Sequence, residues 1–526
     1  MKEFIAKHQA QILGVVSGFD RLVFRGTLRG LAYVEGMRRY LNAQHVLLKD
    51  VGTHVGEVSE RLKAASLAEA RVLGRAVVHL FSSKTDKEQT ARRIMADEGI
   101  VDGLVCVLTC VEPCQSFEIR RDREAQKLVL QARRRQCLFL YHYWVHPVFG
   151  FMHARIQTWF PFSIQVCLNG REWLARQLDA AGLAYVRHGN CFPWIADWAQ
   201  AQRLLDRQVH AHWPRLLNGL ARHLNPRHAT LFAAYPVSYY WSTHQSEWAT
   251  DLVFRDAAAL RRLYPRLLHH AVTTFGSTDV MRFLGRRLPL SGAVPTRFAG
   301  EVVSDLRERA EGIRIKHGVN RNSVKLYDKA YTAVGNVLRA ETTINNVADL
   351  RVYRPVEGDP DGALAWRGMR RGIADLHRRA EISKKSTERY LDALASVDED
   401  TTLDDLLRRV GRPTAWHGRR VRALRPWATE DSALLAAVSR GEFTLNGFRN
   451  RDLQGIFFPR PAATPAEARR RSAWVSRQLR LLRAHGLIRK VTGTHRYQGT
   501  ASGRTVITAV LTALRATVRQ LTQIAA

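Results

Sequence analysis

The stretch TPAEARRRSAWVSRQLRLLRAHG (residues 464–486) carries the strongest structural signal in the chain. Thr464 can cap a helix, Pro465 suits the first helical position, and Glu467 completes a capping box. Gly486 ends the pattern, because glycine leaves the helical conformation easily. Helical spacing predicts an inward stripe of small and apolar residues: Ala468, Ser472, Val475, Leu479 and Leu482.

The segments on either side of this helix complete an ordered set of elements. GFRNRDLQGIFF (447–458) has a helical pattern, and PRPAATP (459–465) has the composition of a turn. LIRKV and HRYQGT are short strand patterns joined by Thr492-Gly493-Thr494, and an apolar helical pattern follows from Gly503. Helix, turn, basic helix, hairpin and closing helix predict a winged helix-turn-helix domain over residues 436–526.

The residues VSRQLRLLRAHGLIRKVTGTHRYQGTASGR (475–504) resemble the recognition helix and wing of MarR-type regulators. The resemblance implies that the basic helix enters a major groove and that the hairpin reaches a neighbouring phosphate or the minor groove. The alternative is a basic amphipathic helix packed inside a helical domain. The DNA-binding residues expected here are Arg469, Arg470, Trp474, Arg477, Arg480, Arg489, Lys490, His495 and Arg496.

The charge of the whole chain points to a polyanionic partner. Its 526 residues include 81 Lys and Arg against 48 Asp and Glu, a formal net charge of +33. Such a surplus favours binding to nucleic acid and predicts a steep dependence on salt. DNA is the expected partner and RNA the alternative, and a homodimer is compatible with the sequence. The preference for arginine can equally reflect a GC-rich genome.

The cysteine spacing and the lengths of the apolar runs indicate the cellular compartment of the protein. Cys106, Cys110 and Cys114 have the spacing C-x3-C-x3-C, which is not a standard zinc pattern, so buried thiols in a reducing cytoplasm are expected. The N-terminus lacks a signal-peptide pattern, and no uninterrupted apolar run reaches about 18 residues. We therefore expect a cytoplasmic protein without a membrane segment.

Residues 1–205 predict a mixed α/β domain with an aromatic sheet. Strand alternation places His142, Trp144 and His146 on one face, and His153, Arg155, Gln157 and Trp159 on one face of the next strand. Three interpretations stay open. His142, His146 and His153 could bind a metal ion. Arg155 and Trp159 could stack unpaired bases. The histidines could instead be satisfied members of a half-buried sheet.

Two acidic patterns are candidates for catalysis. GFDRLVFRG (18–26) resembles the first strand of RNase H-like nucleases, in which carboxylates on neighbouring strands hold two metal ions. Asp20 would then need partners such as Glu112, Asp251 or Glu341. Residues 206–295 predict a helical region. Helical spacing there places His244, Glu247 and Asp251 on one face, either as ligands or acid–base groups or as a salt-bridged surface.

Residues 296–355 predict a small antiparallel sheet. The expected strands are 313–319, 323–329 and 337–344, with Asn320-Arg321-Asn322 as the first hairpin loop. Alternation gives each strand a polar face. If these faces coincide, they form a cationic nucleic-acid surface carrying a tyrosine and a carboxylate: Arg314, Lys316, Lys325, Tyr327, Lys329, Arg339 and Glu341.

VKLYDK followed by LRAET is similar to a K-x-Y-D-K…L-R-x-E signature of replication initiators from filamentous phages and plasmids. That resemblance implies that Tyr327 attacks a DNA strand, with Lys325, Lys329 and Glu341 as further catalytic candidates. The paired histidines of such enzymes are not matched, because His142 and His146 stand four residues apart. A nuclease would require Mg²⁺ or Mn²⁺; otherwise no cofactor is expected. Binding, catalysis and a purely structural sheet remain alternatives.

Together these patterns predict an α+β multidomain chain, with a basic helical region at 363–435 before the winged helix. No GxxxxGK[ST] phosphate loop occurs, which argues against a nucleotide-driven motor. The preferred function is a DNA-processing protein of a mobile element, similar to a replication initiator or a transposase. The alternatives are a non-enzymatic MarR-like regulator and an RNA-binding protein with an aromatic β-surface. The whole sequence also resembles a group of uncharacterised bacterial proteins.

Overall fold

The computed structural model describes residues 1–285, 302–309, 312–329, 336–356, 359, 361–395, 402–440, 443, 447–491 and 494–518. The expected linker at 287–296 lies outside these ranges. The chain is mixed α/β, as expected, and divides into two compact units. The first unit comprises Met1–Val15, Ala249–Met369 and Glu381–Ala526, and the second comprises Val16–Trp248 and Arg370–Ala380. Each unit joins segments that are far apart in the sequence, a division unlike the consecutive ranges expected.

The main sheet has 11 strands in the order β10-β11-β12-β13-β9-β1-β6-β5-β4-β3-β2. Two strands contribute residues to both units: β1 (Ile12–Leu28) and β9 (Tyr239–Phe254). The register pairs are antiparallel except for β2 and β3, which are parallel. The other strands of this sheet in the second unit are β2 (Val77–Leu80), β3 (Gly103–Asp122), β4 (Lys127–His146), β5 (Gly150–Gln157) and β6 (Ile164–Asn169).

Helices surround the sheet of the second unit. The longest are α3 (Val51–Ser66), α7 (Trp198–His210) and α8 (Trp213–Leu224). The remaining elements are η1 (Arg29–Leu31), α2 (Val34–Ala43), η2 (Leu48–Asp50), α4 (Ala68–Val72), α5 (Lys87–Asp97), α6 (Gly170–Ala180), β7 (Tyr185–His188), β8 (Cys191–Ile195), α9 (His228–Leu231) and η3 (Ile373–Asp375).

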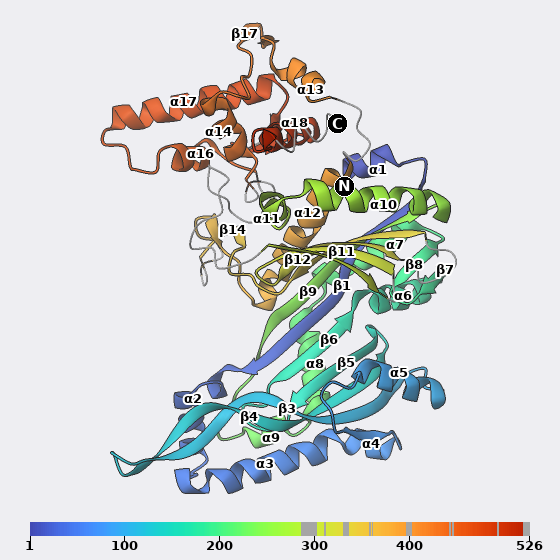
Figure 1. Cartoon of the computed structure of the whole chain (residues 1–526). Helices are drawn as coiled ribbons and strands as arrows, with labels where there is room; N and C mark the ends of the chain where they lie inside the picture. The colour runs from blue at the N-terminus through green and yellow to red at the C-terminus, as the bar shows by residue number, and fades with distance from the viewer. Residues whose placement is uncertain are drawn as a thin grey trace. The chain divides into compact units, whose positions relative to one another are not determined.

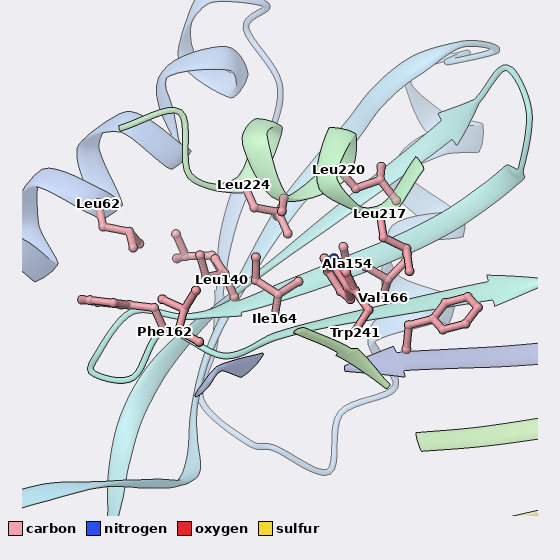
Figure 2. Packing of buried hydrophobic residues seen from close by; sticks show 14 of the residues in the cluster. Leu62, Leu140, Ala154, Phe162, Ile164, Val166, Leu217, Leu220, Leu224 and Trp241 are labelled. Atoms are coloured by element: carbon pink, nitrogen blue, oxygen red, sulfur yellow. The ribbon is translucent and has the colours of Figure 1, made fainter. Parts of the chain in front are cut away.

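The core of the second unit lies between its sheet and helices α3 and α8. Leu217, Leu220 and Leu224 recur along one face of α8 and are all buried. Figure 2 shows them next to the buried side chains Ala154 of β5 and Val166 of β6. Each fully buried leucine contributes about 1.5–3 kcal/mol relative to an exposed one. This packing fixes the sheet that carries the polar groups described below.

The first unit places a helix against one face of its strands. α10 (Ala257–Thr274) buries Leu260, Leu263 and Leu267 in a cluster that includes Leu326 and Leu338 of the sheet. Tyr264 donates its hydroxyl to the carbonyl of Ile313 at 2.7 Å. The other elements outside the C-terminal module are α1 (Lys2–Lys7), α11 (Ser277–Phe283), β10 (Val303–Arg309), β11 (Gly312–Val319), β12 (Asn322–Lys329), β13 (Val337–Ile344), β14 (Arg351–Arg354), β15 (Ala365–Gly368) and α12 (Leu376–Leu394).

The three strands predicted between 313 and 344 are confirmed as β11, β12 and β13, and β10 extends them. The loop between β11 and β12 is a residue shorter than expected. Asn320 and Arg321 adopt φ values of 46° and 68°. A two-residue loop with positive φ at both positions matches the twist of paired strands, and Asn is suited to the first position. Local turn chemistry thus sets the register of this hairpin.

The helical prediction across residues 239–254 is wrong, because this segment is β9. Its run of Tyr, Trp, Ser and Thr has strand propensity, and pairing with neighbouring strands decides its conformation. His244, Glu247 and Asp251 therefore do not share a helical face. In a strand, His244 and Glu247 point to opposite sides, whereas Glu247 and Asp251 point to the same side.

Residues 402–518 form the C-terminal module, which lies in the first unit and has its own apolar cluster. Leu434, Leu453, Leu479, Leu482 and Val510 are among its fully buried members. Its elements are α13 (Leu403–Val410), β16 (Thr414–Trp416), β17 (Arg419–Val421), α14 (Thr429–Val438), α16 (Asn450–Phe457), α17 (Pro465–Ala484), β18 (Ile488–Lys490), β19 (Tyr497–Gly499) and α18 (Ala501–Ala513).

Among the described helices, none combines the length and apolar character required to cross a membrane.

One buried ion pair joins β9 to β13 inside the first unit. Arg339 donates from Nε and Nη2 to the two carboxylate oxygens of Asp251, at 2.6 and 2.8 Å, and both side chains are 0% exposed. Asp251→Ala would leave the Arg339 guanidinium buried without this carboxylate. We expect the variant to lose about 3–5 kcal/mol of unfolding free energy, measured by urea denaturation followed by circular dichroism.

Asp404→Ala is the matched control, because Asp404 pairs with Arg408 on the exposed surface of α13. Its unfolding free energy should change by less than about 0.5 kcal/mol. Asp251→Ala/Arg339→Met should recover part of the loss, since it removes both charges together. Equal effects of Asp251→Ala and Asp404→Ala would contradict a structural role for the buried pair.

Candidate nucleic-acid interface

The basic helix predicted from 464 to 485 is present as α17, and its start is capped as expected. The Thr464 hydroxyl accepts the Glu467 N–H at 3.2 Å, and Pro465 is the first helical residue. Glu467 accepts the Ala463 N–H at 2.8 Å and binds Arg471. Hydrogen bonds from residues 463–467 therefore cap the start of this helix locally.

The inward stripe of α17 is shorter than predicted. Val475, Leu479 and Leu482 are buried in the cluster of the C-terminal module, together with Leu481. Ser472 is half-buried, and Ala468 is exposed, so placing Ala468 in the stripe was wrong. Ala468 lies in the first turns of the helix, which do not contact the apolar cluster of the C-terminal module. Only the C-terminal half of α17 packs into the core.

Trp474 was expected on the DNA-binding face, but it contacts the preceding helix instead. Its ring lies 5.1 Å from the Phe457 ring and 5.7 Å from the Phe458 ring, both near edge-on. The indole is half-buried at this contact. Aromatic pairs of this geometry stabilise packing. Trp474 therefore holds α16 and α17 together rather than standing among the exposed arginines.

Four arginines form an exposed row on α17, here called the arginine ridge: Arg469, Arg470, Arg477 and Arg480. Helical periodicity puts them on one face, with exposed Ala473 and Ser476 between them. Within the described ranges, none of the four forms an ion pair. This ridge is a surface of concentrated positive charge whose small neighbours leave the guanidinium groups accessible.

A short basic hairpin follows α17. Arg489 and Lys490 of β18 are exposed and pair in register with Gln498 and Tyr497 of β19. Tyr497 also exchanges two backbone hydrogen bonds with Phe448, at 2.8 and 2.9 Å, which ties the hairpin to the segment before α16. Thr492 and Gly493 of the expected turn lie outside the described residues.

The two remaining candidates near this hairpin differ in exposure. His495 is exposed, whereas Arg496 is half-buried with its guanidinium 4.2 Å from the centre of the Tyr353 ring. Arg489 and Lys490 are thus exposed cations of the hairpin, and the His495 side chain is also exposed. The Arg496 guanidinium instead makes a cation–π contact with Tyr353.

The expected polar face of β11, β12 and β13 is confirmed by the strand register. Arg314 lies opposite Tyr327, which lies opposite Arg339. In the next row of that face, Lys316 lies opposite Lys325, which lies opposite Glu341. The sequence correctly grouped these side chains, because the side-chain alternation of strands repeats every two residues.

Exposure of this polar face was wrongly predicted, since most of its groups are buried. Lys325, Lys329 and Arg339 are buried, and Lys325 forms an ion pair with Glu341. Although burial opposes ionisation of Glu341, Lys325 holds the pKa of its carboxyl below its usual value. Glu341 and Asp251 therefore bind Lys325 and Arg339 within the protein, and this face is not an open cationic surface.

Tyr327, the candidate nucleophile, lies within this buried face. Its side chain is 5% exposed, and the Lys329 ammonium lies 4.5 Å from its ring centre. Burial raises the pKa of Tyr327 to about 12, although Lys325 and Arg314 act in the opposite direction. The four catalytic candidates Tyr327, Glu341, Lys325 and Lys329 are brought together, but the phenol is disfavoured as a nucleophile because its ionised form is destabilised.

The proposed three-histidine metal site is contradicted by the register. Tyr143 pairs with His153 and His142 pairs with Ala154, so His142 and His153 point to opposite faces. His142 contacts the Ser66 hydroxyl at 3.0 Å, and His146 accepts the N–H groups of residues 148 and 149. Burial lowers the pKa of His142 and of His153 to about 3, so both rings are neutral near pH 7.

Arg155 and Trp159 do not form an open stacking surface. The Arg155 guanidinium donates to Glu112, the Tyr141 hydroxyl and Gln165, at 2.6, 2.7 and 2.9 Å. Trp159 is half-buried and packs against apolar clusters. Cys106, Cys110 and Cys114 are buried free thiols, as expected. Arg155 and Trp159 are therefore engaged inside the protein.

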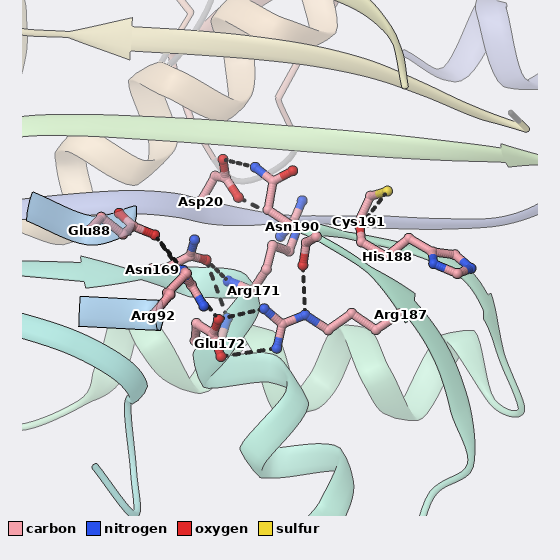
Figure 3. A network of polar contacts seen from close by, with 11 residues as sticks. Asp20, Glu88, Arg92, Asn169, Arg171, Glu172, Arg187, His188, Asn190 and Cys191 are labelled. Atoms are coloured by element: carbon pink, nitrogen blue, oxygen red, sulfur yellow. Dashed lines mark hydrogen bonds and ion pairs between the residues drawn. The ribbon is translucent and has the colours of Figure 1, made fainter. Parts of the chain in front are cut away.

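A pair of carboxylates was missed because β9 was predicted as a helix. Asp20 of β1 and Glu247 of β9 have carboxylate oxygens within 4.8 Å of each other in the second unit. Figure 3 shows Asp20 beside Asn190, whose amide donates to it at 3.2 Å, and beside Arg171, whose Nε lies 3.9 Å away. Carboxylate oxygens are the ligands that a hard cation such as Mg²⁺ prefers.

The other sequence-derived acids are held by basic groups. Glu112 binds Arg155 and Lys87, and Asp251 binds Arg339. Glu172, next to Arg171 in the sequence, binds Arg187 at 2.6 Å and Arg92 at 3.5 Å (Figure 3). Only strand pairing identifies Glu247 as the neighbour of Asp20, and the signal for it was the aromatic and hydroxyl-rich composition of residues 239–250.

Asp328 gives a pH test of the strand that carries Tyr327. Burial raises the pKa of Asp328 to about 6, against a smaller opposing effect of Arg261. A carboxyl with a raised native pKa stabilises the fold at low pH, and this contribution is lost as pH rises from about 4 through about 6. Asp328→Asn should therefore gain melting temperature relative to the native sequence between pH 5 and pH 7. Asp404→Asn, at an exposed position of α13, is the control. A difference in melting temperature that does not change with pH would contradict the burial of Asp328.

Comparison of the chain with protein families, with curated proteins and with solved structures gave no match.

Proposed function

We propose that this chain binds duplex DNA through a winged helix formed by residues 436–526. The single observation that carries the proposal is the arginine ridge on α17, which is exposed and lacks ion pairs among the described residues. A second exposed group, Arg489 and Lys490 of β18 together with His495, belongs to the same module. Both groups provide phosphate ligands, and arginine can also read guanine in the major groove.

The order of elements supports the winged-helix proposal. α14, α16, α17, the β18–β19 hairpin and α18 follow one another, and Phe448 adds a short bridge beside β19. In a winged helix, the second helix of the helix-turn-helix enters the major groove and the hairpin contacts the backbone beside it. α17 would be the groove helix. Trp474 would set its angle to α16 through the contacts with Phe457 and Phe458.

Duplex DNA fits this surface better than RNA. The major groove of B-DNA admits an α-helix, whereas that of A-form RNA is too deep and narrow for side chains to read. Single-stranded binding would need exposed aromatic rings on which bases can stack. Trp159, the ring that the sequence suggested for that role, is half-buried in apolar contacts. The proposal is therefore a duplex-binding module.

A second candidate function, DNA processing, is favoured by the Asp20–Glu247 pair. Its two carboxylates fit Mg²⁺ or Mn²⁺, which proteins often hold by one or two carboxylates together with substrate phosphate oxygens and water. A bound ion would polarise the phosphate and lower the pKa of water. Asn190 and Arg171 would orient Asp20 through the contacts given above. This candidate agrees with the expectation of a mobile-element protein, while the buried phenol of Tyr327 favours hydrolysis over a tyrosine-linked intermediate.

Arg477→Ala tests the DNA-binding proposal. If Arg477 contacts a base edge, the variant should weaken binding to its preferred duplex by about 1–3 kcal/mol, or about 5- to 150-fold, with less loss on other sequences. Fluorescence anisotropy with a selected duplex and a scrambled one measures both losses. Arg408→Ala is the matched control, because it removes one exposed arginine from α13 of the same module.

Equal losses on both duplexes would make Arg477 a phosphate contact and would keep the helix at the interface. Equal affinities for the native sequence, Arg477→Ala and Arg408→Ala would remove α17 from the interface and overturn the proposal.

Asp20→Asn and Glu247→Gln test DNA processing. With supercoiled plasmid and Mg²⁺ or Mn²⁺, the native sequence should produce nicks, and each variant should reduce the nicking rate by at least tenfold. Denaturing gels measure the rate. Asp206→Asn, at an exposed position of α7, is the control. Glu341→Gln and Tyr327→Phe test the other candidates from the sequence. Circular dichroism checks the fold of each variant. Nicking that survives in Asp20→Asn and Glu247→Gln would exclude this pair as the metal site.

A further inference from the structure

The two longest strands of the second unit extend past their neighbours as a two-stranded ribbon. β3 and β4 pair along their 20-residue lengths, but β5 pairs with β4 only from Phe139 to His146. β2 pairs with β3 only between Val107 and Cys110. The β-ribbon is defined here as residues 111–138, from the pair Val111–Leu138 to the connecting turn. Figure 1 shows its cyan tip reaching beyond the adjacent strands of this unit.

The β-ribbon carries an uneven distribution of charge. Its exposed cations are Arg120, Arg121, Arg123, Lys127, Arg133, Arg134 and Arg135. Glu118 binds both Arg120 and Arg133 at 2.7 Å, and Asp122 accepts two backbone N–H groups of the turn. No ion pair within the described part of the chain involves Arg121, Arg123, Lys127, Arg134 or Arg135.

The β-ribbon is anchored at its base, so its cations have defined positions. Phe117 and Leu130 are buried in the main core of the second unit, and Ile119 packs against the same cluster. The Ser116 hydroxyl donates to the Phe160 carbonyl at 2.7 Å. Arg134 and Arg135 are consecutive in β4 and therefore point to opposite faces. The β-ribbon thus presents cations on both of its faces.

We propose that the β-ribbon is a second DNA contact, which inserts between the two phosphate backbones lining a groove of duplex DNA. A two-stranded β-ribbon fits the B-DNA major groove, and cations on both faces meet the phosphates on both walls. Phe117 is the aromatic residue of the ribbon, and it is buried, so base stacking on a single strand is disfavoured. This inference rests on the proposed binding of DNA and adds a contact outside the C-terminal module.

A rival explanation is protection of an exposed strand edge. Natural sheets place charged residues on free edges to prevent association with other chains. That explanation predicts aggregation when the arginines are removed, with no change in affinity for DNA. The DNA-contact proposal predicts a weaker affinity and a smaller dependence on salt, because each lost phosphate contact lowers the number of released counterions.

Arg134→Gln/Arg135→Gln in the full chain separates these explanations. Anisotropy with a labelled duplex at several salt concentrations gives the affinity and the slope of its logarithm against the logarithm of salt concentration. The slope should fall in magnitude by about 1.8 for two lost contacts. Affinity should fall at least fivefold. Arg203→Gln/Arg207→Gln removes two exposed charges from α7 of the same unit and should leave both quantities near their native values.

Each other outcome has a defined meaning. Unchanged affinity in the ribbon variant, with a loss in Arg477→Ala, overturns the ribbon contact and leaves the winged-helix proposal intact. Equal losses of affinity in the β-ribbon and α7 variants would mean that affinity depends only on the net charge of the protein, and they would also overturn the ribbon contact. A loss of affinity in the β-ribbon variant without a loss in Arg477→Ala would support the ribbon contact and would exclude α17 from the interface with DNA. No duplex binding by the native sequence overturns both.

Arg121→Gln/Lys127→Gln provides a second variant at the tip of the β-ribbon, away from Phe117 and Leu130. It keeps the test decisive if Arg134→Gln/Arg135→Gln does not fold. The tip variant should reduce affinity and the salt slope in the same direction. Gel filtration of all variants detects the association that edge protection predicts, and association without a loss of affinity would overturn the DNA contact.

Discussion

The buried pair of Arg339 and Asp251 shows the constraint under which this chain folds. A guanidinium group cannot lose its charge, so burying one requires a carboxylate or several acceptors. Basic residues outnumber acidic ones in this sequence, and several of the buried carboxylates hold arginines. Asp375 holds Arg370 and Arg378, Asp431 holds Arg422, and Glu172 holds Arg187 and Arg92. Buried carboxylates thus act as anchors for arginines.

This use of carboxylates determines where positive charge remains. On α17, Glu467 binds Arg471 near the cap, which leaves the arginine ridge without acidic partners among the described residues. On the β-ribbon, Glu118 binds Arg120 and Arg133, and cations remain near the tip. The polar face of β11–β13 shows the opposite result, because Glu341 and Asp251 neutralise Lys325 and Arg339 there. Cationic residues in the sequence therefore have different roles according to the acids placed beside them.

The sequence predicted what is decided locally. The cap at Thr464, the strands from 313 to 344 and the grouping of Lys325 with Glu341 depend on neighbouring residues and on alternation. Exposure of that grouped face could not be predicted, because it depends on segments far along the chain. β9 was missed for the same reason, and with it the approach of Glu247 to Asp20, which lies more than 200 residues earlier. Trp474 was misplaced because an aromatic residue on a basic helix can face either solvent or an adjacent helix.

The arginine ridge has a further consequence for the helix that carries it. Arg477 and Arg480 stand three residues apart on one face of α17, so their charges repel each other. Mobile ions screen this repulsion, and the folded helix should therefore become more stable as ionic strength increases. Attraction to a polyanion is weakened by the same ions. Folding of α17 and its attachment to an anionic polymer thus respond to ionic strength in opposite directions.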